Sequence, residues 1–201
     1  MAYRNFKFID LEEKFGIKQT KASLFNFEIK PVEPSAFLLE SMNLSKSIPL
    51  TTEKIVSEAL VFPVLREIKM NNKEFIELYS GENLDADKHN GLNGECDFIF
   101  TKSPDSVEIK APIIQVIETK QGEISRPKPL AQVSAQLIGT RFFNQKQEKP
   151  TEPLYGVCTS GFEWLFLKLE GSFIVIDTQP FFISDLPRLL GGFQYIIDLS
   201  R

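Results

Sequence analysis

Apolar residues follow a helical spacing in some segments and a strand spacing in others, and the order of these segments predicts the fold. In chain order we expect a helix over 51–70, strands over 74–79, 94–101 and 113–120, a helix over 127–145, a strand over 154–159, a hairpin over 162–177 and a final helix within 183–198. Pro63 lies inside the first helix and should bend it or end its first part. Pro187 and Gly191-Gly192 are expected to interrupt the last one.

The strand over 113–120 is apolar along nearly its whole length, so both of its faces need cover. Helices must therefore lie on both sides of the sheet. The expected fold is an α/β/α sandwich around a central mixed sheet, followed by a C-terminal hairpin and helix.

Residues 1–50 lack the regular pattern of the rest and are expected to form an extension packed on the core, with the main domain over 51–201. Within the extension, Phe25, Phe27 and Ile29 alternate like a short strand, and a short helix is expected from Ser35.

Composition narrows the chemistry. His89 is the single histidine, and Cys96 and Cys158 do not form a Cys-x-x-Cys pair. Multi-histidine metal sites are excluded, and thiolate zinc sites and disulfide frameworks are disfavoured. Any metal would be held by oxygen ligands, which favours Mg²⁺ or Mn²⁺. No segment is apolar for long enough to span a bilayer and the N-terminus lacks an apolar signal core, so we expect a cytoplasmic protein with no membrane partner.

The formal net charge of −4 argues against strong sequence-independent binding to nucleic acid. The segment 120–149 departs from this balance, because it carries six lysine or arginine residues against two glutamates. A local basic surface is therefore compatible with the acidic chain.

The main chemical signal lies at the end of the strand over 113–120. Side chains alternate along a strand, so Glu118 and Lys120 share a face, together with Ile114 and Val116. A hairpin pairing with the strand over 94–101 could set Asp97 beside Glu118. Buried charges are costly unless they are paired or bind a metal.

The helix over 51–70 adds another carboxylate. Glu58 lies on one helical stripe with Ile55, Phe62 and Leu65, so we expect it to face inward and to join a polar cluster. The alternative for the whole set is an ordinary surface ion pair between Glu118 and Lys120, with unrelated carboxylates elsewhere.

Asp97, followed about twenty residues later by Glu118-x-Lys120, resembles the signature of the PD-(D/E)XK nuclease superfamily. The element order of helix, three strands, helix and strand is also similar to the common core of that family, over roughly residues 52–178. Cys96 stands where many members have proline. The resemblance implies a restriction-endonuclease-like fold for 51–201 and is strongest to small uncharacterised bacterial members.

The resemblance also implies roles. Asp97, Glu118 and the backbone carbonyl of Thr119 would bind the divalent cation, and Glu58 would hold it through a water or bind a second ion. Lys120 would orient or help deprotonate a metal-activated water that attacks a phosphodiester in line. The implied activity is an endo- or exonuclease acting on nucleic acid, with DNA favoured.

Four further residues are candidate substrate contacts. Gln132 and Gln136 lie one turn apart on the helix over 127–145, and related nucleases often place a glutamine near the site there. Arg126 and Lys128 could contact substrate phosphates. A solvated glutamine pair and a solvated charged turn explain the same residues.

Two other functions stay open at this point. The chain could be a catalytically silent binding or regulatory module that keeps the fold, which the acidic charge favours. It could also be a subunit whose homodimer or partner subunit builds the groove.

Overall fold

A computed structural model of the chain describes residues 2–201, and its centre is an eight-stranded mixed sheet. The strands are β1 (Lys18–Ala22), β2 (Glu77–Asn83), β3 (Glu95–Thr101), β4 (Ile113–Thr119), β5 (Leu154–Thr159), β6 (Glu163–Glu170), β7 (Phe173–Asp177) and β8 (Phe181–Phe182). Seven of them form the order β1-β7-β6-β5-β4-β3-β2, and β8 pairs with β6. The β4–β5 and β1–β7 pairs are parallel and the others are antiparallel.

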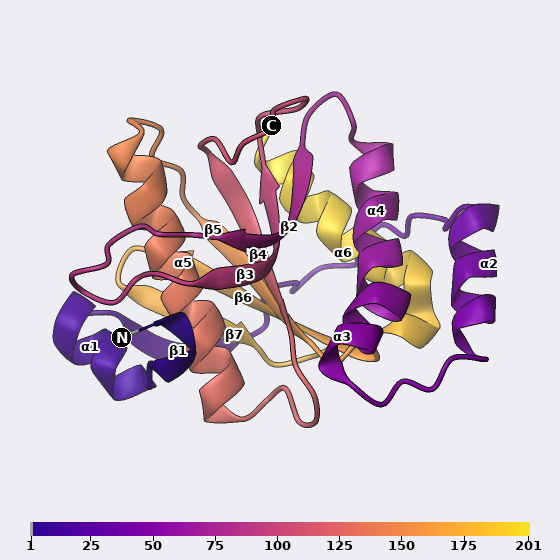
Figure 1. Cartoon of the computed structure of the whole chain (residues 1–201), viewed down its shortest axis with the longest axis horizontal. Coiled ribbons are helices and arrows are strands. Elements are labelled where there is room, and N and C mark those ends of the chain that lie inside the picture. Colours follow the sequence, from indigo (N-terminus) through magenta and orange to yellow (C-terminus); the bar gives the residue numbers. More distant parts are fainter. Residues whose placement is uncertain (1) are drawn as a thin grey trace.

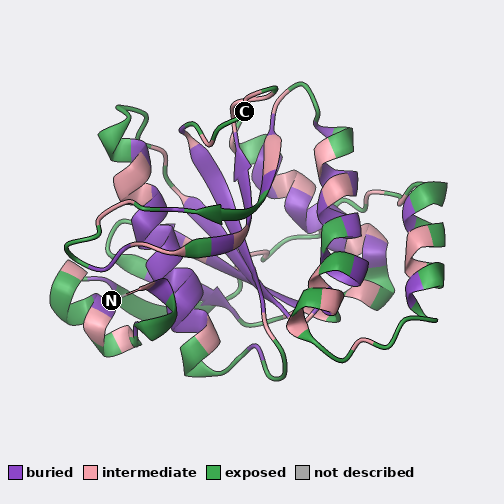
Figure 2. Cartoon of the chain, in the orientation of Figure 1, coloured by how far each residue is buried: buried purple, intermediate pink, exposed green. Residues whose placement is uncertain are grey.

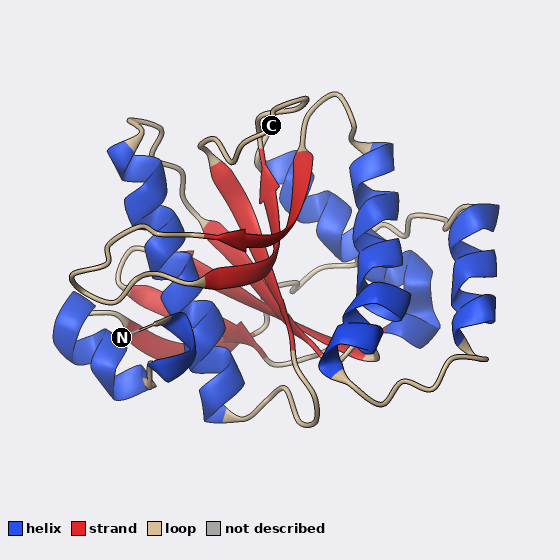
Figure 3. Ribbon diagram, viewed as in Figure 1, coloured by secondary structure: helices blue, strands red, loops and turns tan. Residues whose placement is uncertain are grey.

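Helices cover both faces of this sheet (Figures 1 and 3). They are α1 (Phe8–Phe15), α2 (Ala36–Ser45), α3 (Glu53–Val56), α4 (Phe62–Asn71), α5 (Pro127–Lys146) and α6 (Leu186–Leu199), with short helical segments η1 (Tyr3–Asn5), η2 (Ser57–Val61) and η3 (Ile183–Asp185). Figure 1 shows α5 on one side of the sheet and α4 and α6 on the other. The predicted α/β/α sandwich is confirmed, including its order of helix, three strands, helix and strand.

Two apolar layers fill the space between the sheet and its helices, and the buried strands run between them (Figure 2). One layer packs α5 and the N-terminal segment on the sheet, with Val133, Leu137 and Tyr3 among its members. The other layer packs α4 and α6, and it contains Val64, Leu65 and Phe193. All seven residues of β4 are buried, as its apolar sequence predicts.

A β-bulge in β4 changes one of the predicted faces. The register with β3 shifts between Phe100 and Thr101, so that Ile114 is left unpaired between Ile113 and Gln115. Ile114 therefore packs in the α4–α6 layer, whereas Val116 packs in the α5 layer. The expected common face of Ile114 with Glu118 is wrong, because one extra residue reverses the alternation.

The helix expected over 51–70 forms, with a π-helical segment in its middle. Thr52 caps its start by accepting a hydrogen bond from the Ile55 amide at 3.2 Å. Segment η2 has π geometry and leads into Pro63, which sits in the first turn of α4. Pro63 has no N–H to donate, so a local widening of the helix adjusts the hydrogen-bond ladder there. Where the helix was expected to bend or to end its first part, it changes from π to α geometry just before Pro63.

The N-terminal extension differs from its prediction. Its strand is β1, a fully exposed and polar segment, whereas residues 25–29 do not pair. Phe25 instead packs its ring against Phe166 and Phe181 at centroid distances of 5.3 and 5.1 Å. The predicted helix after Ser35 is present, and the Ser35 side chain caps it.

The final helix α6 continues through the two glycines that were expected to interrupt it. A Cβ on Gly191 would lie 2.3 Å from the carbonyl oxygen of Lys30, and one on Gly192 would lie 3.0 Å from the Phe181 ring. The glycines are therefore needed for close packing, and Pro187 occupies the first turn, where proline is tolerated.

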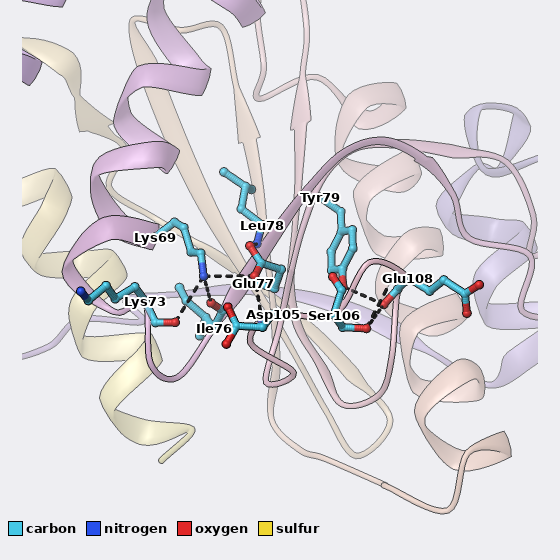
Figure 4. Close-up of polar contacts among 9 residues, drawn as sticks. All are labelled: Lys69, Lys73, Ile76, Glu77, Leu78, Tyr79, Asp105, Ser106 and Glu108. Atoms are coloured by element: carbon cyan, nitrogen blue, oxygen red, sulfur yellow. Dashed lines mark hydrogen bonds and ion pairs between the residues drawn. The ribbon is translucent and has the colours of Figure 1, made fainter.

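A polar network closes the end of the β2–β3 hairpin where α4 stops (Figure 4). Lys69 of α4 forms an ion pair with Glu77 at 3.1 Å and donates to the Ile76 carbonyl at 2.7 Å. Glu77 also accepts from the amides of Leu78 and Asp105, each at 3.1 Å. This network ties α4, β2 and the β3–β4 connection together.

Across residues 2–201, none of the helices has both the length and the apolar character that crossing a bilayer would require.

Candidate functional site

A cleft of about 540 Å³ opens between α3, η2 and the β2–β3 hairpin. Four carboxylates and one lysine are among the residues that line it, together with an aromatic ring and small residues: Glu53, Lys54, Ser57, Glu58, Phe62, Ser80, Gly81, Glu95, Asp97 and Phe98. The ring of Phe62 is 38% exposed and stacks on Phe98 at 6.3 Å between centroids. The cleft is therefore acidic, with one exposed aromatic wall.

Asp97 and Glu118 come from the neighbouring strands β3 and β4. Each lies one residue beyond the Phe98↔Ile117 pair, with which the register of these two strands ends. The Asp97 carboxylate accepts the Thr119 amide hydrogen at 2.7 Å. The charge of Asp97 acts on Glu118, so the two carboxylates lie within electrostatic reach of each other, with Asp97 on the cleft wall and Glu118 only 3% exposed.

Lys120 joins Glu118 to Glu53 of α3. Its ammonium lies 2.7 Å from Glu118 Oε1 and 3.5 Å from Glu53 Oε1. The Lys120 amide donates to the Thr159 carbonyl at 2.7 Å, which fixes the backbone where β4 ends. The amide of Gln121 donates to the other oxygen of Glu53 at 3.0 Å, so α3 is held against the end of β4.

The two glutamines of α5 hold Glu118 from the opposite side. Gln136 donates through Nε2 to Glu118 Oε2 at 2.6 Å, and Gln132 donates through Nε2 to Glu118 Oε1. Both side chains are buried, which rules out the solvated pair that the sequence left open. The α5 helix is buried on most of its surface, so the glutamines reach the sheet among apolar neighbours.

Burial and neighbouring charges shift the pKa values of all three ionisable groups. Burial raises the pKa of Glu118 to about 7, and the negative charge of Asp97 adds to this effect. Burial also raises the pKa of Asp97, against the opposing effects of the Thr119 amide and the Lys120 ammonium. For Lys120 burial lowers the pKa, but the carboxylates, Glu118 first, outweigh it and the net pKa is raised. The lysine therefore stays an ammonium beside two carboxylates that repel each other.

Glu58 does not face inward as the sequence predicted. Its side chain is 61% exposed and lies 3.9 Å from Lys54, on the rim of the same cleft as Asp97. The stripe with Ile55 and Phe62 is not the buried one, because the π segment changes the helical phase after Val56. The expected inward orientation of Glu58 is wrong.

Glu53 occupies the position that the sequence reading gave to Glu58. It is the first residue of α3, where the Thr52 cap places it, and it contacts both Lys120 and Gln121. The sequence Thr52-Glu53 could have indicated a helix start with Glu53 in its first turn, because the helix dipole favours an acidic residue there.

The two basic residues proposed as phosphate contacts lie away from the cleft. Arg126 pairs with Glu123 at 3.0 Å, with both side chains largely exposed. Lys128 is exposed and lines a separate cavity with residues of the N-terminal segment. Glu95, which shares the cleft wall with Asp97, is exposed.

The donor set fits a hard divalent cation of the Mg²⁺ type. Asp97, Glu118 and the Thr119 carbonyl offer only oxygen, and such an ion needs just one or two carboxylates and keeps several waters. Within residues 2–201, no group of three or more His, Cys, Asp or Glu side chains is arranged so that it could hold a metal ion by itself. The Oε1 atom of Gln136 is buried and has no hydrogen-bond partner among the described residues, so an unused acceptor belongs to the side chain that holds Glu118.

Comparisons with known proteins do not identify a family for this chain. No protein-family model matches the chain, and no curated protein matches it. Among solved structures, the chain is similar to the type IIG restriction endonuclease BpuSI, with 19% identity and a TM-score of 0.45. The match covers 69% of this chain and only 16% of the restriction enzyme. Similarity this low does not transfer the activity of that enzyme.

Proposed function

We propose that the chain is a divalent-metal-dependent nuclease with a PD-(D/E)XK-like site, acting on DNA. The observation that carries the proposal is the convergence of Asp97 and Glu118 from neighbouring strands, with Lys120 bonded to Glu118 at 2.7 Å. A buried carboxylate and a half-buried one that repel each other are stabilised when a cation is shared between them. A purely structural ion pair with Lys120 would need only one of the two carboxylates.

Asp97, Glu118 and the Thr119 carbonyl are the residues that would hold the cation. When bound, Mg²⁺ or Mn²⁺ supplies an activated water at neutral pH and offsets negative charge on the phosphoryl oxygens. Asp97 is already anchored by the Thr119 amide, so one of its oxygens is fixed before any ion arrives. Such preorganisation lowers the cost of assembling the site.

Lys120 would supply positive charge to the reacting phosphate. Its ammonium is held between Glu118 and Glu53, and only 20% of the side chain is exposed. A protonated lysine in this position orients a nucleophilic water and stabilises charge that develops on phosphate oxygens. Glu53 positions Lys120 from α3.

Gln132 and Gln136 would act through Glu118. Each donates an amide hydrogen to a different oxygen of that carboxylate, which limits its rotation. Partners behind a metal ligand commonly orient it. Neither glutamine lines the cleft, so we assign them as positioning residues and withdraw the direct substrate contact expected from the sequence.

The competing function is a silent nucleic-acid or protein-binding module, and the acidic lining of the cleft favours it. Glu53, Glu58, Glu95 and Asp97 outnumber Lys54 there. A polyanionic substrate is repelled by such a surface unless cations intervene.

Cleavage of single- and double-stranded DNA, and of RNA, with Mg²⁺ or Mn²⁺ tests the proposal. The wild type should cut at least one substrate, and Asp97→Ala and Lys120→Ala should not. Chelation by EDTA should stop the reaction. A wild type that cuts none of them, and whose Tm does not respond to metal, would favour the binding module.

A further inference from the structure

A second cavity, of about 570 Å³, lies between the N-terminal segment, β1 and the start of α5. Its lining contains three cationic side chains and no acidic one: Arg4, Asn5, Phe6, Lys7, Phe8, Gln19, Pro127 and Lys128. Figure 1 shows η1 and α1 beside α5. In a chain with more acidic than basic residues, this lining is opposite in sign to that of the cleft.

The three cations of this cavity are not neutralised within the fold. Arg4, Lys7 and Lys128 are exposed, and none of them takes part in an ion pair within residues 2–201. The neighbouring carboxylate, Asp10, instead caps α1 by accepting the Lys7 amide hydrogen at 2.7 Å. Three like charges around one hollow repel one another, so the hollow is suited to an anion.

The cavity and the cleft are joined through one helix. Lys128 precedes Gln132 by four residues on α5, about one turn or ~6 Å along the axis. Gln132 donates to Glu118, so α5 connects the cavity to a carboxylate of the candidate site.

We propose that this cavity binds the phosphodiester backbone of the nucleic-acid strand whose cleavage occurs in the cleft. The proposal rests on the proposed nuclease function and adds the place where substrate affinity arises. The acidic cleft repels a polyanion, so binding free energy must come from another surface. Arg4, Lys7 and Lys128 provide one, and phosphate contacts of this kind position a strand without reading its sequence.

The test is the salt dependence of binding to a fluorescent single-stranded 20-mer DNA, measured in EDTA so that no cleavage occurs. The triple variant Arg4→Ala, Lys7→Ala, Lys128→Ala is compared with wild type and with a matched control that also loses three exposed positive charges, through Lys30→Ala, Lys73→Ala and Lys146→Ala. Each lost contact to a single strand lowers the slope of log K against log salt by about 0.7. The cavity variant should therefore lose about 2 units of slope, and the control should keep the wild-type slope.

Wild-type slope and affinity in the cavity variant would overturn the proposal, as would equal losses in both triple variants. Inorganic phosphate provides the second arm. If phosphate raises the Tm of wild type but not of the cavity variant, while oligonucleotide binding is unchanged, the cavity is a small-anion site and the backbone assignment is wrong. The single variant Lys128→Ala, with an expected loss of about 0.7 units, checks the result with minimal change to the fold.

The outcome is separable from that of the nuclease proposal. The cavity variant should keep the wild-type rise in Tm with Mn²⁺, because it leaves Asp97 and Glu118 intact. Loss of slope without any metal-dependent cleavage would support the anion surface and contradict the nuclease. Metal-dependent cleavage with an unchanged slope would support the nuclease and contradict the anion surface.

Discussion

Two lysine–glutamate pairs stand at opposite ends of β3, and they differ in how completely their charges are satisfied. Near its last residue, Glu77 pairs with Lys69 and also accepts two backbone amides (Figure 4). Near its first residue, Glu118 pairs with Lys120 but also experiences the negative charge of Asp97. In each pair a glutamate of the sheet contacts a lysine. Only the Glu118 pair has a second carboxylate, Asp97, near it.

The pKa values move in opposite directions for a physical reason. Burial would raise the pKa of Glu77, but the Leu78 amide, Lys69 and the Asp105 amide outweigh it, and the pKa is lowered. At Glu118 burial and the charge of Asp97 win, and the pKa rises to about 7. The Glu77 carboxylate has an ion pair and two amide donors, so we interpret this network as structural. The Glu118 site has an excess of negative charge that a cation would remove.

The largest expected effect is the loss of cleavage in Asp97→Asn and Glu118→Gln. Each substitution removes one charged ligand, and metal-dependent cleavage should fall by roughly 10³-fold or more. Initial rates with Mg²⁺ and Mn²⁺ measure this. Glu77→Gln is the matched control, since it changes the same functional group in the satisfied pair. A similar loss of rate in Glu77→Gln would contradict the distinction between the two ends.

Gln136→Leu should have the next largest effect. It removes the donor to Glu118 Oε2 and leaves the cleft lining unchanged, so activity should fall about 10- to 100-fold. The metal concentration needed for half-maximal rate should rise, whereas the KM for DNA should not. Recovery of rate at saturating Mn²⁺ would show positioning of the ligand. A rise in KM alone would mean that Gln136 contacts substrate after all.

Glu77→Gln should lower the free energy of unfolding by about 1–2 kcal/mol. The new amide nitrogen cannot accept from Lys69 and the Asp105 amide as the carboxylate does. Because the folded pKa of Glu77 is lowered, the ionised group stabilises the fold above its ordinary pKa of 4.5, and this contribution is lost as the pH falls through the folded value. Urea titrations should therefore show a gap between wild type and variant at pH 7 that narrows below about pH 4. An unchanged gap at low pH would mean that the carboxylate charge is not the cause.

The smallest expected effects separate the two glutamates of the helix. Glu53→Gln weakens the hold on Lys120 and should reduce the rate by about tenfold. Glu58→Gln affects an exposed pair with Lys54, whose contribution is about 0–1 kcal/mol, and should leave both rate and stability near wild type. Parallel kinetics of the two variants decide between them. A larger loss in Glu58→Gln would restore that residue as the functional helix carboxylate.

The sequence predicted the part of the site that depends on strand alternation. A long apolar run ends in Glu118-x-Lys120, and Asp97 lies on the preceding strand. Strand alternation alone predicts that Glu118 and Lys120 share a face, without knowledge of how the helices pack. The bulge at Ile114 did not disturb this, because it lies upstream of Val116. Most elements of the sandwich were predictable for the same reason.

Other features depended on information that periodicity does not carry. A regular helical wheel selected Glu58, and the π segment before Pro63 changes the phase that such a wheel assumes. Strand β1 is polar because it is an exposed edge, so its sequence has no apolar alternation to detect. The partners of Gln132 and Gln136 follow from how α5 docks on β4, which is a tertiary contact.

Calorimetric titration with Mn²⁺ at neutral pH tests the central claim most directly, on wild type, Asp97→Asn, Glu118→Gln and Glu77→Gln. The account predicts at least one ion per chain for wild type and Glu77→Gln, with that binding lost in Asp97→Asn and in Glu118→Gln. Wild-type Mn²⁺ binding in either of those two variants would contradict it.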